Sequence, residues 1–262
     1  MNNLNYCYMC NCEANTREHV PPKNLFPEAK DVAGNYRNNL ITVPSCEKHN
    51  SAKSSDDEFL MINLAGIFGN NSIGYQHKLT KVDRALRRNS SSLLKKLMNG
   101  SKIIKTVEIS KNKFVDIIWG TPDAARLQSC FDHIARGIHF HHFGMRFPGK
   151  IQIFMGYLFF KERNSKKWAE FIHDRAELDL KDKPKHGENA EIFYYQVSDF
   201  DEFGLFMMRF CFYGGLHVYA SFMHPSATPP FNLAGALLNE GLPVIFTLGS
   251  KSYKFNSSDK NN

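Results

Sequence analysis

The sequence predicts an α+β fold in three consecutive parts, and three observations predict this division. Residues 1–57 are rich in Cys, His, Asn and Pro and contain few long apolar runs, which is typical of a small module that buries too little surface to fold without a metal or a disulfide. Residues 58–113 combine amphipathic helical patterns with a strong excess of basic residues. Residues 114–262 hold β-branched and aromatic runs around one long helical pattern, as an α+β domain does.

The composition supports a buried core and indicates a reducing compartment. The chain of 262 residues is 42% hydrophobic and 13% aromatic, which argues against disorder. Its first residues lack the features of a secretory signal, and no apolar run approaches the roughly 20 residues that span a bilayer. We therefore expect a cytoplasmic protein with no membrane contact, in which the six cysteines are metal ligands or core thiols rather than disulfides.

The net charge of +7 is concentrated in one segment. Residues 78–113 contain eleven Lys and Arg residues against Asp83 and Glu108, whereas residues 114–262 hold sixteen basic and sixteen acidic residues. A local excess of this size attracts a polyanion, and nucleic acid is the natural candidate. The alternative is the solvated basic face of a helix. The candidates for nucleic-acid contact in this segment are Arg84, Arg87, Arg88, Lys95 and Lys96.

Hydrophobic periodicity predicts the main helices and strands. Helices are expected from about residue 56 to just before Gly69, over residues 80–99 and over residues 123–142. Runs of β-branched and aromatic residues predict strands at 113–119, 151–160, 192–197, 205–213 and 244–248. A turn is expected at 120–122 and a polar loop at 179–190.

Two pairs of metal-ligand residues frame the N-terminal part. Cys7 and Cys10 form a CxxC pair, and Cys46 and His49 form a CxxH pair after 35 intervening residues. Two residues between ligands let both side chains converge on one Zn²⁺ ion with tetrahedral geometry. We therefore predict a structural zinc site made by these four residues. Reduced core thiols are the alternative interpretation, and Cys12 competes with Cys10 as a ligand, although we prefer Cys10.

Between these pairs lies the dipeptide Glu18-His19, followed by Val20 and two prolines. Prolines cannot donate to a β-ladder, so the dipeptide should lie at the end of a short strand or turn, where it is exposed to a substrate. A second short strand is expected at residues 38–43, and a helix should begin near Ser45.

The predicted helix that follows Ser45 carries three polar residues on one face. Asn50, Lys53 and Asp57 are spaced at i, i+3 and i+7 and therefore share that face. Lys53 is a candidate for a phosphate contact, with a solvent-facing lysine as the alternative. We expect Asp57 to be solvated.

The order CxxC, Glu-His-Val-Pro-Pro, Asn-Leu and CxxH-Asn-xx-Lys over residues 7–57 resembles the HNH endonucleases with a ββα-metal core. It is most similar to the branch in which two ligand pairs hold a structural zinc. The resemblance implies that Glu18 ligates a catalytic divalent metal, Mg²⁺ or Mn²⁺, and that His19 activates water as a general base. It also implies that Asn39 orients His19 through its side-chain amide, and that Asn50 is a further ligand of the catalytic metal.

The chain departs from the family at the last motif position, which is often His and is here Asn50, directly after His49. Either His49 closes the zinc site and Asn50 meets the catalytic metal, or His49 turns to the catalytic metal and leaves the zinc with three protein ligands. The CxxH spacing favours the first arrangement.

The resemblance implies a metal-dependent endonuclease that hydrolyses phosphodiester bonds in DNA. The alternative is a zinc-dependent nucleic-acid-binding protein without catalysis. A third hypothesis is that residues 114–262 bind a regulatory ligand or partner protein and gate the nuclease in a defence role. Because the family cuts one strand at each active site, a homodimer would supply the two sites that double-strand cleavage needs.

Two further patterns are interpreted as structural. His139, His141 and His142 suggest a second metal site, but the phenylalanines among them favour a packed helix end. Aromatic residues at 193–195 and 210–213 suggest a surface for base stacking, but their alternation along strands favours core positions. Cys130 and Cys211 lie in apolar segments and are expected to be buried thiols.

Overall fold

The computed structural model describes residues 6–50, 54–67, 69–88, 98–110, 113–227 and 232–257. It has mixed helix and sheet, which confirms the α+β class. The chain divides into two compact units, each built from segments that are discontinuous in the sequence. The first unit comprises Met1–Phe147, His186–Tyr194 and Cys211–Leu216, and the second comprises Pro148–Lys185, Tyr195–Phe210 and His217–Asn262. The boundaries predicted from the sequence, at residues 57 and 113, do not coincide with the boundaries of these two units.

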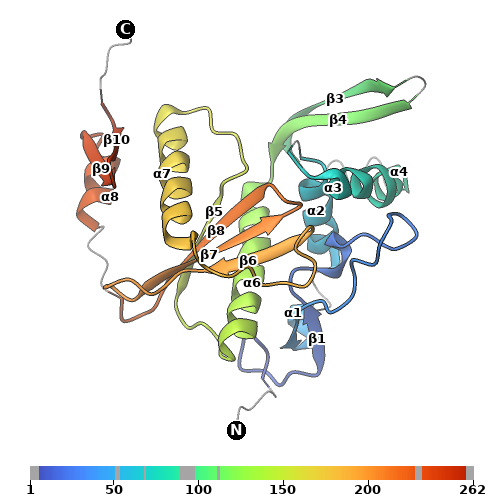
Figure 1. Ribbon diagram of the computed structural model, residues 1–262, viewed down its shortest axis with the longest axis horizontal. Helices are drawn as coiled ribbons and strands as arrows, with labels where there is room; N and C mark the ends of the chain where they lie inside the picture. The colour runs from blue at the N-terminus through green and yellow to red at the C-terminus, as the bar shows by residue number, and fades with distance from the viewer. Residues whose placement is uncertain are drawn as a thin grey trace. The chain divides into compact units, whose positions relative to one another are not determined.

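The N-terminal part of the first unit is a short hairpin followed by helices. Strand β1 (Thr16–His19) pairs antiparallel with β2 (Thr42–Ser45), and the short 3-10 helix η1 (Lys23–Leu25) lies between them. Helix α1 (Glu47–Asn50) follows β2 and lies beside β1 (Figure 1). The first predicted helix is confirmed as α2 (Ser54–Ala65), which buries six apolar side chains.

The middle of the chain differs from the prediction. Helix α3 (Ser72–His77) continues through the π-helical segment η3 (Lys78–Val82) into α4 (Asp83–Arg88). The predicted helix over 80–99 is wrong at its end, because Met98 and Asn99 belong to strand β3 (Met98–Ser110). Residues 58–113 are therefore not a purely helical connector.

Strand β3 pairs antiparallel with β4 (Lys113–Pro122), so that Val107 lies opposite Val115 and Ile104 opposite Ile118. The β-branched residues of β3 and β4 favour this extended conformation. Their preference explains why the predicted helix does not continue to residue 99. Strand β4 contains the predicted strand at 113–119 and extends over 120–122, where a turn was expected.

The long predicted helix is confirmed as α6 (Ala124–Phe143). Asp123 caps its start by accepting a hydrogen bond from the backbone N–H of Arg126, and Gly144, with φ of 71°, ends it. The four apolar residues expected to face inward are buried, and Phe131 packs on Phe212 with ring centroids 5.9 Å apart. The predicted inward-facing residues are Leu127, Phe131, Ile134 and Ile138.

A four-stranded sheet has the order β5-β8-β7-β6. Its strands are β5 (Lys150–Met155), β6 (Phe193–Val197), β7 (Leu205–Phe212) and β8 (Leu216–Met223). The prediction finds β6 and β7 and the start of β5, but it misses β8. The aromatic residues of β6 and β7 are mostly buried, which agrees with core positions rather than an exposed stacking surface.

The second unit also contains elements that the sequence analysis does not predict. Helix α7 (Arg163–Leu180) precedes β6 and reaches into the expected polar loop at 179–190. Strand β9 (Val244–Leu248), which is predicted, forms a hairpin with β10 (Lys251–Phe255), and helix α8 (Asn232–Asn239) lies before it. Trp168 of α7 packs against Phe246 and Phe255 of this hairpin. Among the described residues, no helix is both long and apolar enough to cross a bilayer.

A buried histidine in α3 links the stability of the fold to pH. The Nε2 atom of His77 lies 3.0 Å from the carbonyl oxygen of Asn24, and burial lowers the pKa of His77 to about 4. Below pH ~6.5 the unfolded chain binds a proton at this residue that the folded chain does not bind. The free energy of unfolding should therefore fall by up to about 3 kcal/mol as the pH drops from ~6.5 to 4, with no effect of this residue above that range.

Urea unfolding at several pH values should show a shallower pH dependence in the His77→Leu variant than in the unchanged protein. Metal release at low pH is common to both proteins and cancels in this difference. Equal slopes would show that His77 is not held neutral by burial.

Candidate metal centre and adjoining pocket

The four predicted zinc ligands converge on one point. The Nδ1 atom of His49 lies 3.5 Å from the sulfur of Cys7, 3.5 Å from that of Cys10 and 3.2 Å from that of Cys46. The sulfurs of Cys10 and Cys46 are 3.8 Å apart. With usual zinc bond lengths, a tetrahedral site has edges of about 3.8 Å between sulfurs and about 3.5 Å between sulfur and nitrogen. The group therefore has the donor set and the spacing of a tetrahedral metal site.

Backbone hydrogen bonds hold both ligand pairs in place. The N–H of Cys7 donates to the carbonyl of Cys12 at 2.9 Å, which closes the first ligand turn. The N–H of Tyr8 donates to the carbonyl of Pro44 at 2.9 Å and joins that turn to β2. The N–H of His49 donates to the carbonyl of Cys46 at 3.0 Å, which closes the second turn.

Two alternatives from the sequence are resolved by this arrangement. Cys12 is exposed and lies outside the ligand group, so the first pair is Cys7 and Cys10. The imidazole of His49 faces the three thiols, which agrees with the arrangement in which His49 closes the site and Asn50 is left for other contacts.

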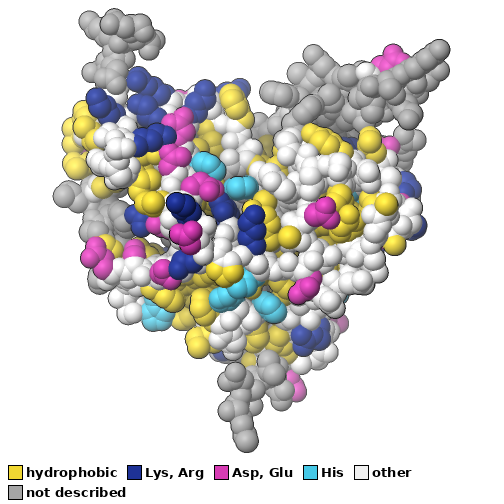
Figure 2. All heavy atoms as spheres, viewed as in Figure 1, with side chains coloured by type: hydrophobic (Ala, Val, Ile, Leu, Met, Phe, Trp, Pro, Cys, Tyr) yellow, Lys and Arg dark blue, Asp and Glu magenta, His cyan; other side chains and the backbone are white. Residues whose placement is uncertain are grey.

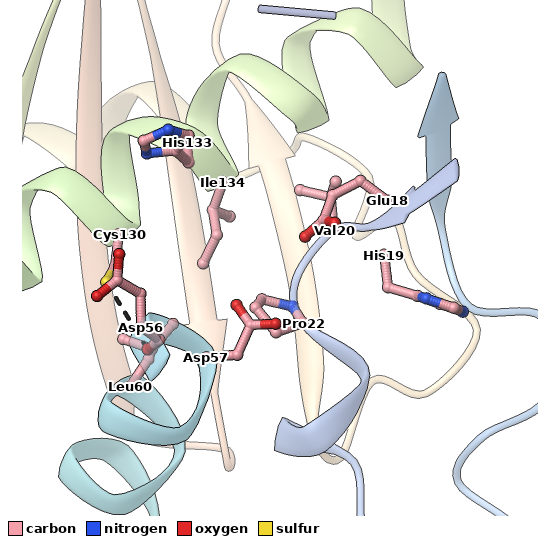
Figure 3. Close-up of a pocket in the computed structure, with 10 residues that line it drawn as sticks. All are labelled: Glu18, His19, Val20, Pro22, Asp56, Asp57, Leu60, Cys130, His133 and Ile134. Atoms are coloured by element: carbon pink, nitrogen blue, oxygen red, sulfur yellow. Dashed lines mark hydrogen bonds between the residues drawn. The ribbon is translucent and has the colours of Figure 1, made fainter. Parts of the chain in front are cut away.

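Glu18 and His19 lie at the end of β1, as predicted, but they face opposite sides of the strand. Glu18 is only 5% exposed, whereas His19 is partly exposed. A small pocket beside β1 has ten lining residues. They are Glu18, His19, Val20, Pro22, Asp56, Asp57, Leu60, Cys130, His133 and Ile134. In Figure 3 the carboxyl groups of Glu18 and Asp57 face this space, while the imidazole of His19 points away from them.

Asp57 is one of the pocket residues that sequence reasoning missed, together with Asp56 and His133. We expected Asp57 to be solvated, yet it lines the same pocket as Glu18. The pKa of the buried Tyr8 phenol is raised, first by burial and then by the negative charges of Glu18, Cys7 and Asp57. Two carboxylates in a partly desolvated space repel one another unless a cation or a proton lies with them. Their oxygens are the donors that a hard divalent cation prefers.

Helix α6 and the segment after His19 approach one another closely. A Cβ atom placed on Gly137 would lie 2.7 Å from the methyl groups of Val20, so only glycine allows this contact. The N–H of Val20 also donates to the carbonyl of Ile41 at 3.0 Å. Val20, which directly follows Glu18 and His19, is thus held by α6 on one side and by the segment before β2 on the other.

The two predicted asparagines differ in their placement. The Asn50 side-chain N–H donates to the carbonyl of Arg17 at 3.3 Å, so Asn50 lies against β1 next to Glu18. Asn39 is exposed in a turn with φ of 51°, before the observed β2 rather than inside a strand at 38–43. Within the described part of the chain, no hydrogen bond joins Asn39 to His19, so the predicted orienting contact is not formed.

The environment of His19 favours its neutral form. Burial lowers the pKa of His19, and the positive charge of Lys23 lowers it further. Lys23 follows the two prolines and begins η1. Its position near His19 was not anticipated from the sequence, because the spacing alone does not show that the chain turns back after Pro22.

Part of the basic segment is neutralised within the first unit. The guanidinium of Arg84 donates to both carboxylate oxygens of Asp31, at 2.8 and 2.7 Å, and Lys81 lies 3.2 Å from Glu28. A phosphate contact of Arg84 would require its ion pair to open. The side chains of the other candidates, Arg87, Arg88, Lys95, Lys96 and Lys53, lie outside the described residues. Away from this segment, in the middle of the face drawn in Figure 2, basic and acidic side chains also lie next to one another.

The histidines at the end of α6 agree with the structural interpretation. The Nδ1 atom of His139 lies 3.0 Å from the carbonyl oxygen of Met145, and its ring packs against Phe143 and Phe147. Among the described residues, the histidines at 139, 141 and 142 do not form a metal-ligand group. Cys130 and Cys211 are buried, as expected.

Comparisons of the chain with models of protein families, with curated proteins and with solved structures find no match.

Removing the metal should destabilise the first unit. We expect the Cys46→Ala variant to bind one zinc equivalent fewer than the unchanged chain, because the loss of one of the three thiolates strongly weakens the affinity of the site. A loss of at least about 3 kcal/mol should follow, which for a chain of this size lowers the melting temperature by roughly 6–12 °C. Metal analysis and calorimetry measure both effects. The matched control is Cys12→Ala, which should keep the zinc and the melting temperature; equal behaviour of the two variants would contradict the assignment.

Proposed function

We propose that the N-terminal unit is a metal-dependent endonuclease site of the HNH type that hydrolyses phosphodiester bonds in DNA. The observation that supports this most is the joint position of Glu18, His19 and Asn50. Glu18 and His19 end strand β1, whose partner strand leads directly into the Cys46–His49 ligand pair. Asn50, the next residue, is hydrogen-bonded to β1 one residue before Glu18.

The oxygen donors of this region suit a hard divalent cation. Glu18 and Asp57 face one pocket, and Asn50 adds an amide oxygen beside the same strand. These three residues would hold Mg²⁺ or Mn²⁺, which when bound neutralises phosphate charge and leaves coordination positions for phosphate oxygens. The zinc-type group of four ligands is separate and has no oxygen donor, so its role is to hold the strand and helix together.

His19 is the proposed general base. Its imidazole accepts a proton from a water molecule, whose oxygen forms a bond to phosphorus. The bond between phosphorus and the leaving oxygen breaks, and that oxygen takes up a proton from solvent. Because His19 and Glu18 face opposite sides of β1, the substrate phosphate has to lie across the end of the strand. The partial exposure of His19 allows this approach.

A second candidate function is zinc-dependent binding of nucleic acid without catalysis. Two observations favour it: Glu18 is almost fully buried, and within the described residues no hydrogen bond joins Asn39 to His19. In that case the carboxylates of the pocket would contribute to the fold and would not hold a catalytic metal. Dimerisation, and regulation through residues 114–262 in a defence role, stay predictions.

Cleavage assays separate the two candidates. With Mg²⁺ or Mn²⁺, purified protein should nick DNA, and His19→Ala should lower the rate at least about 10²-fold because the general base is lost. Glu18→Gln should also lower it, by weakening the metal site. The matched control is His224→Ala, which changes an exposed histidine of the second unit and should leave the rate unchanged.

Cleavage by His19→Ala at the rate of the unchanged protein would overturn the proposed mechanism. If the unchanged protein binds DNA and retains its zinc but does not cut single- or double-stranded DNA with either metal, the second candidate is the better account. Thermal unfolding of each variant shows whether a lost rate reflects chemistry or folding.

A further inference from the structure

A second group of metal-ligand side chains lies in the second unit, apart from the proposed nuclease site. His173 and Glu177 are one helical turn apart on α7, and His217 lies near the start of β8. One ligand atom of each lies within 4.8 Å of the others. Two ligands on one first-row metal ion are about 3.0–3.5 Å apart, so small side-chain rotations close the group. None of the three residues is fully buried, and an ion could reach them from solvent.

A buried tyrosine orients both imidazoles. The hydroxyl of Tyr219 lies 2.7 Å from Nδ1 of His173 and 3.4 Å from Nδ1 of His217. Tyr219 is 2% exposed and packs against Ala176 and Leu180 of α7, so its position is fixed. Histidine ligands commonly use one ring nitrogen for such a partner and the other for the metal. With Nδ1 of both rings at the Tyr219 hydroxyl, Nε2 would be the metal-binding nitrogen of each ring.

The carboxylate of Glu177 is oriented in a similar way. Arg209, which is 6% exposed, forms an ion pair with one oxygen of Glu177 and donates to the side-chain oxygen of Gln196. Gln196 in turn donates to the carbonyls of Leu180 and Lys183 at 3.1 and 2.7 Å. This chain of contacts ties the carboxylate to the end of α7 and leaves its second oxygen available to a cation.

From these contacts we propose that His173, Glu177 and His217 form a binding site for a first-row transition metal ion such as Zn²⁺, Co²⁺ or Fe²⁺, with Tyr219 and Arg209 as positioning residues. Two imidazoles and one carboxylate are the donors such ions prefer, whereas Mg²⁺ and Ca²⁺ prefer sites made of oxygen. The positive charge of Arg209 also disfavours Mg²⁺ and Ca²⁺, which are held mainly by electrostatic attraction to negatively charged oxygens. Three protein ligands leave coordination positions open to water or a small ligand, unlike the closed Cys7–Cys10–Cys46–His49 group.

Cobalt binding to the full-length chain under reducing conditions tests the site directly. With Mg²⁺ in large excess, so that the proposed nuclease site is occupied, we expect two equivalents of Co²⁺ to bind. One should show the thiolate-to-cobalt charge-transfer bands of the cysteine site, and the other should show only d–d bands. The second equivalent should be lost in the His173→Ala/His217→Ala double variant, whereas the thiolate bands should remain and report that the first unit is folded.

Three further variants sharpen the test. Tyr219→Phe keeps the ring in the core but removes the hydroxyl, and it should weaken the second equivalent by about 10- to 100-fold. Glu177→Gln should weaken it by at least tenfold, while His224→Ala should leave it unchanged. The proposal is overturned if only one equivalent binds to the unchanged protein, or if the double variant binds the second equivalent as tightly as the unchanged protein does.

Discussion

Three thiols and one imidazole converge on a single point in the first unit, and the arrangement of residues 6–50 depends on this convergence. The two ligand pairs are separated by 35 residues of chain that contain little helix or strand beyond β1 and β2. Val20, Leu25, Phe26, Val32 and Val43 of this segment are buried, but so little of its backbone is in regular structure that a cross-link would help to offset its conformational entropy. A metal bound by the four ligands would supply this cross-link and would at the same time remove the repulsion between neighbouring thiolates.

The position of the pocket follows from this cross-link. The ligand turns are hydrogen-bonded to β2, and β2 pairs with β1, so the end of β1 is held where Glu18 and His19 lie. Helix α6 closes the other side through the contact between Gly137 and Val20. The carboxylates of Glu18 and Asp57 thereby share a partly desolvated space that neither would create alone. The proposed chemistry depends on this spatial arrangement more than on the dipeptide itself.

The sequence predicted features that depend on local spacing. The metal ligands follow from two short ligand pairs, and α6 follows from the helical spacing of its apolar residues. Strands β6, β7 and β9 follow from runs of β-branched and aromatic residues. These signals lie within a few residues of one another and need no knowledge of the tertiary structure.

Features that depend on distant contacts were not predictable in the same way. Asp57 was expected to be solvated. Helical spacing alone does not show that Asp57 of α2 lines the same pocket as Glu18 of β1. The family resemblance implies that Asn39 orients His19, but Asn39 is exposed and has a left-handed backbone conformation in the long connection between β1 and β2. The group of His173, Glu177 and His217 joins a helix to a strand more than 35 residues further along the chain. Helix α7 itself was missed because its amphipathic pattern is rich in charged residues.

The central claim, that the four-ligand metal site holds the β1–β2 hairpin in place, is tested most directly by amide hydrogen exchange with and without metal. The amides of Tyr8 and Val20, which donate to Pro44 and Ile41, report on the hairpin. After the metal is removed by a chelator, both amides should exchange much faster, while amides of the β9–β10 hairpin in the second unit should be unaffected. If metal analysis confirms complete removal and the Tyr8 and Val20 amides keep their protection, the hairpin does not depend on the metal and the account is contradicted.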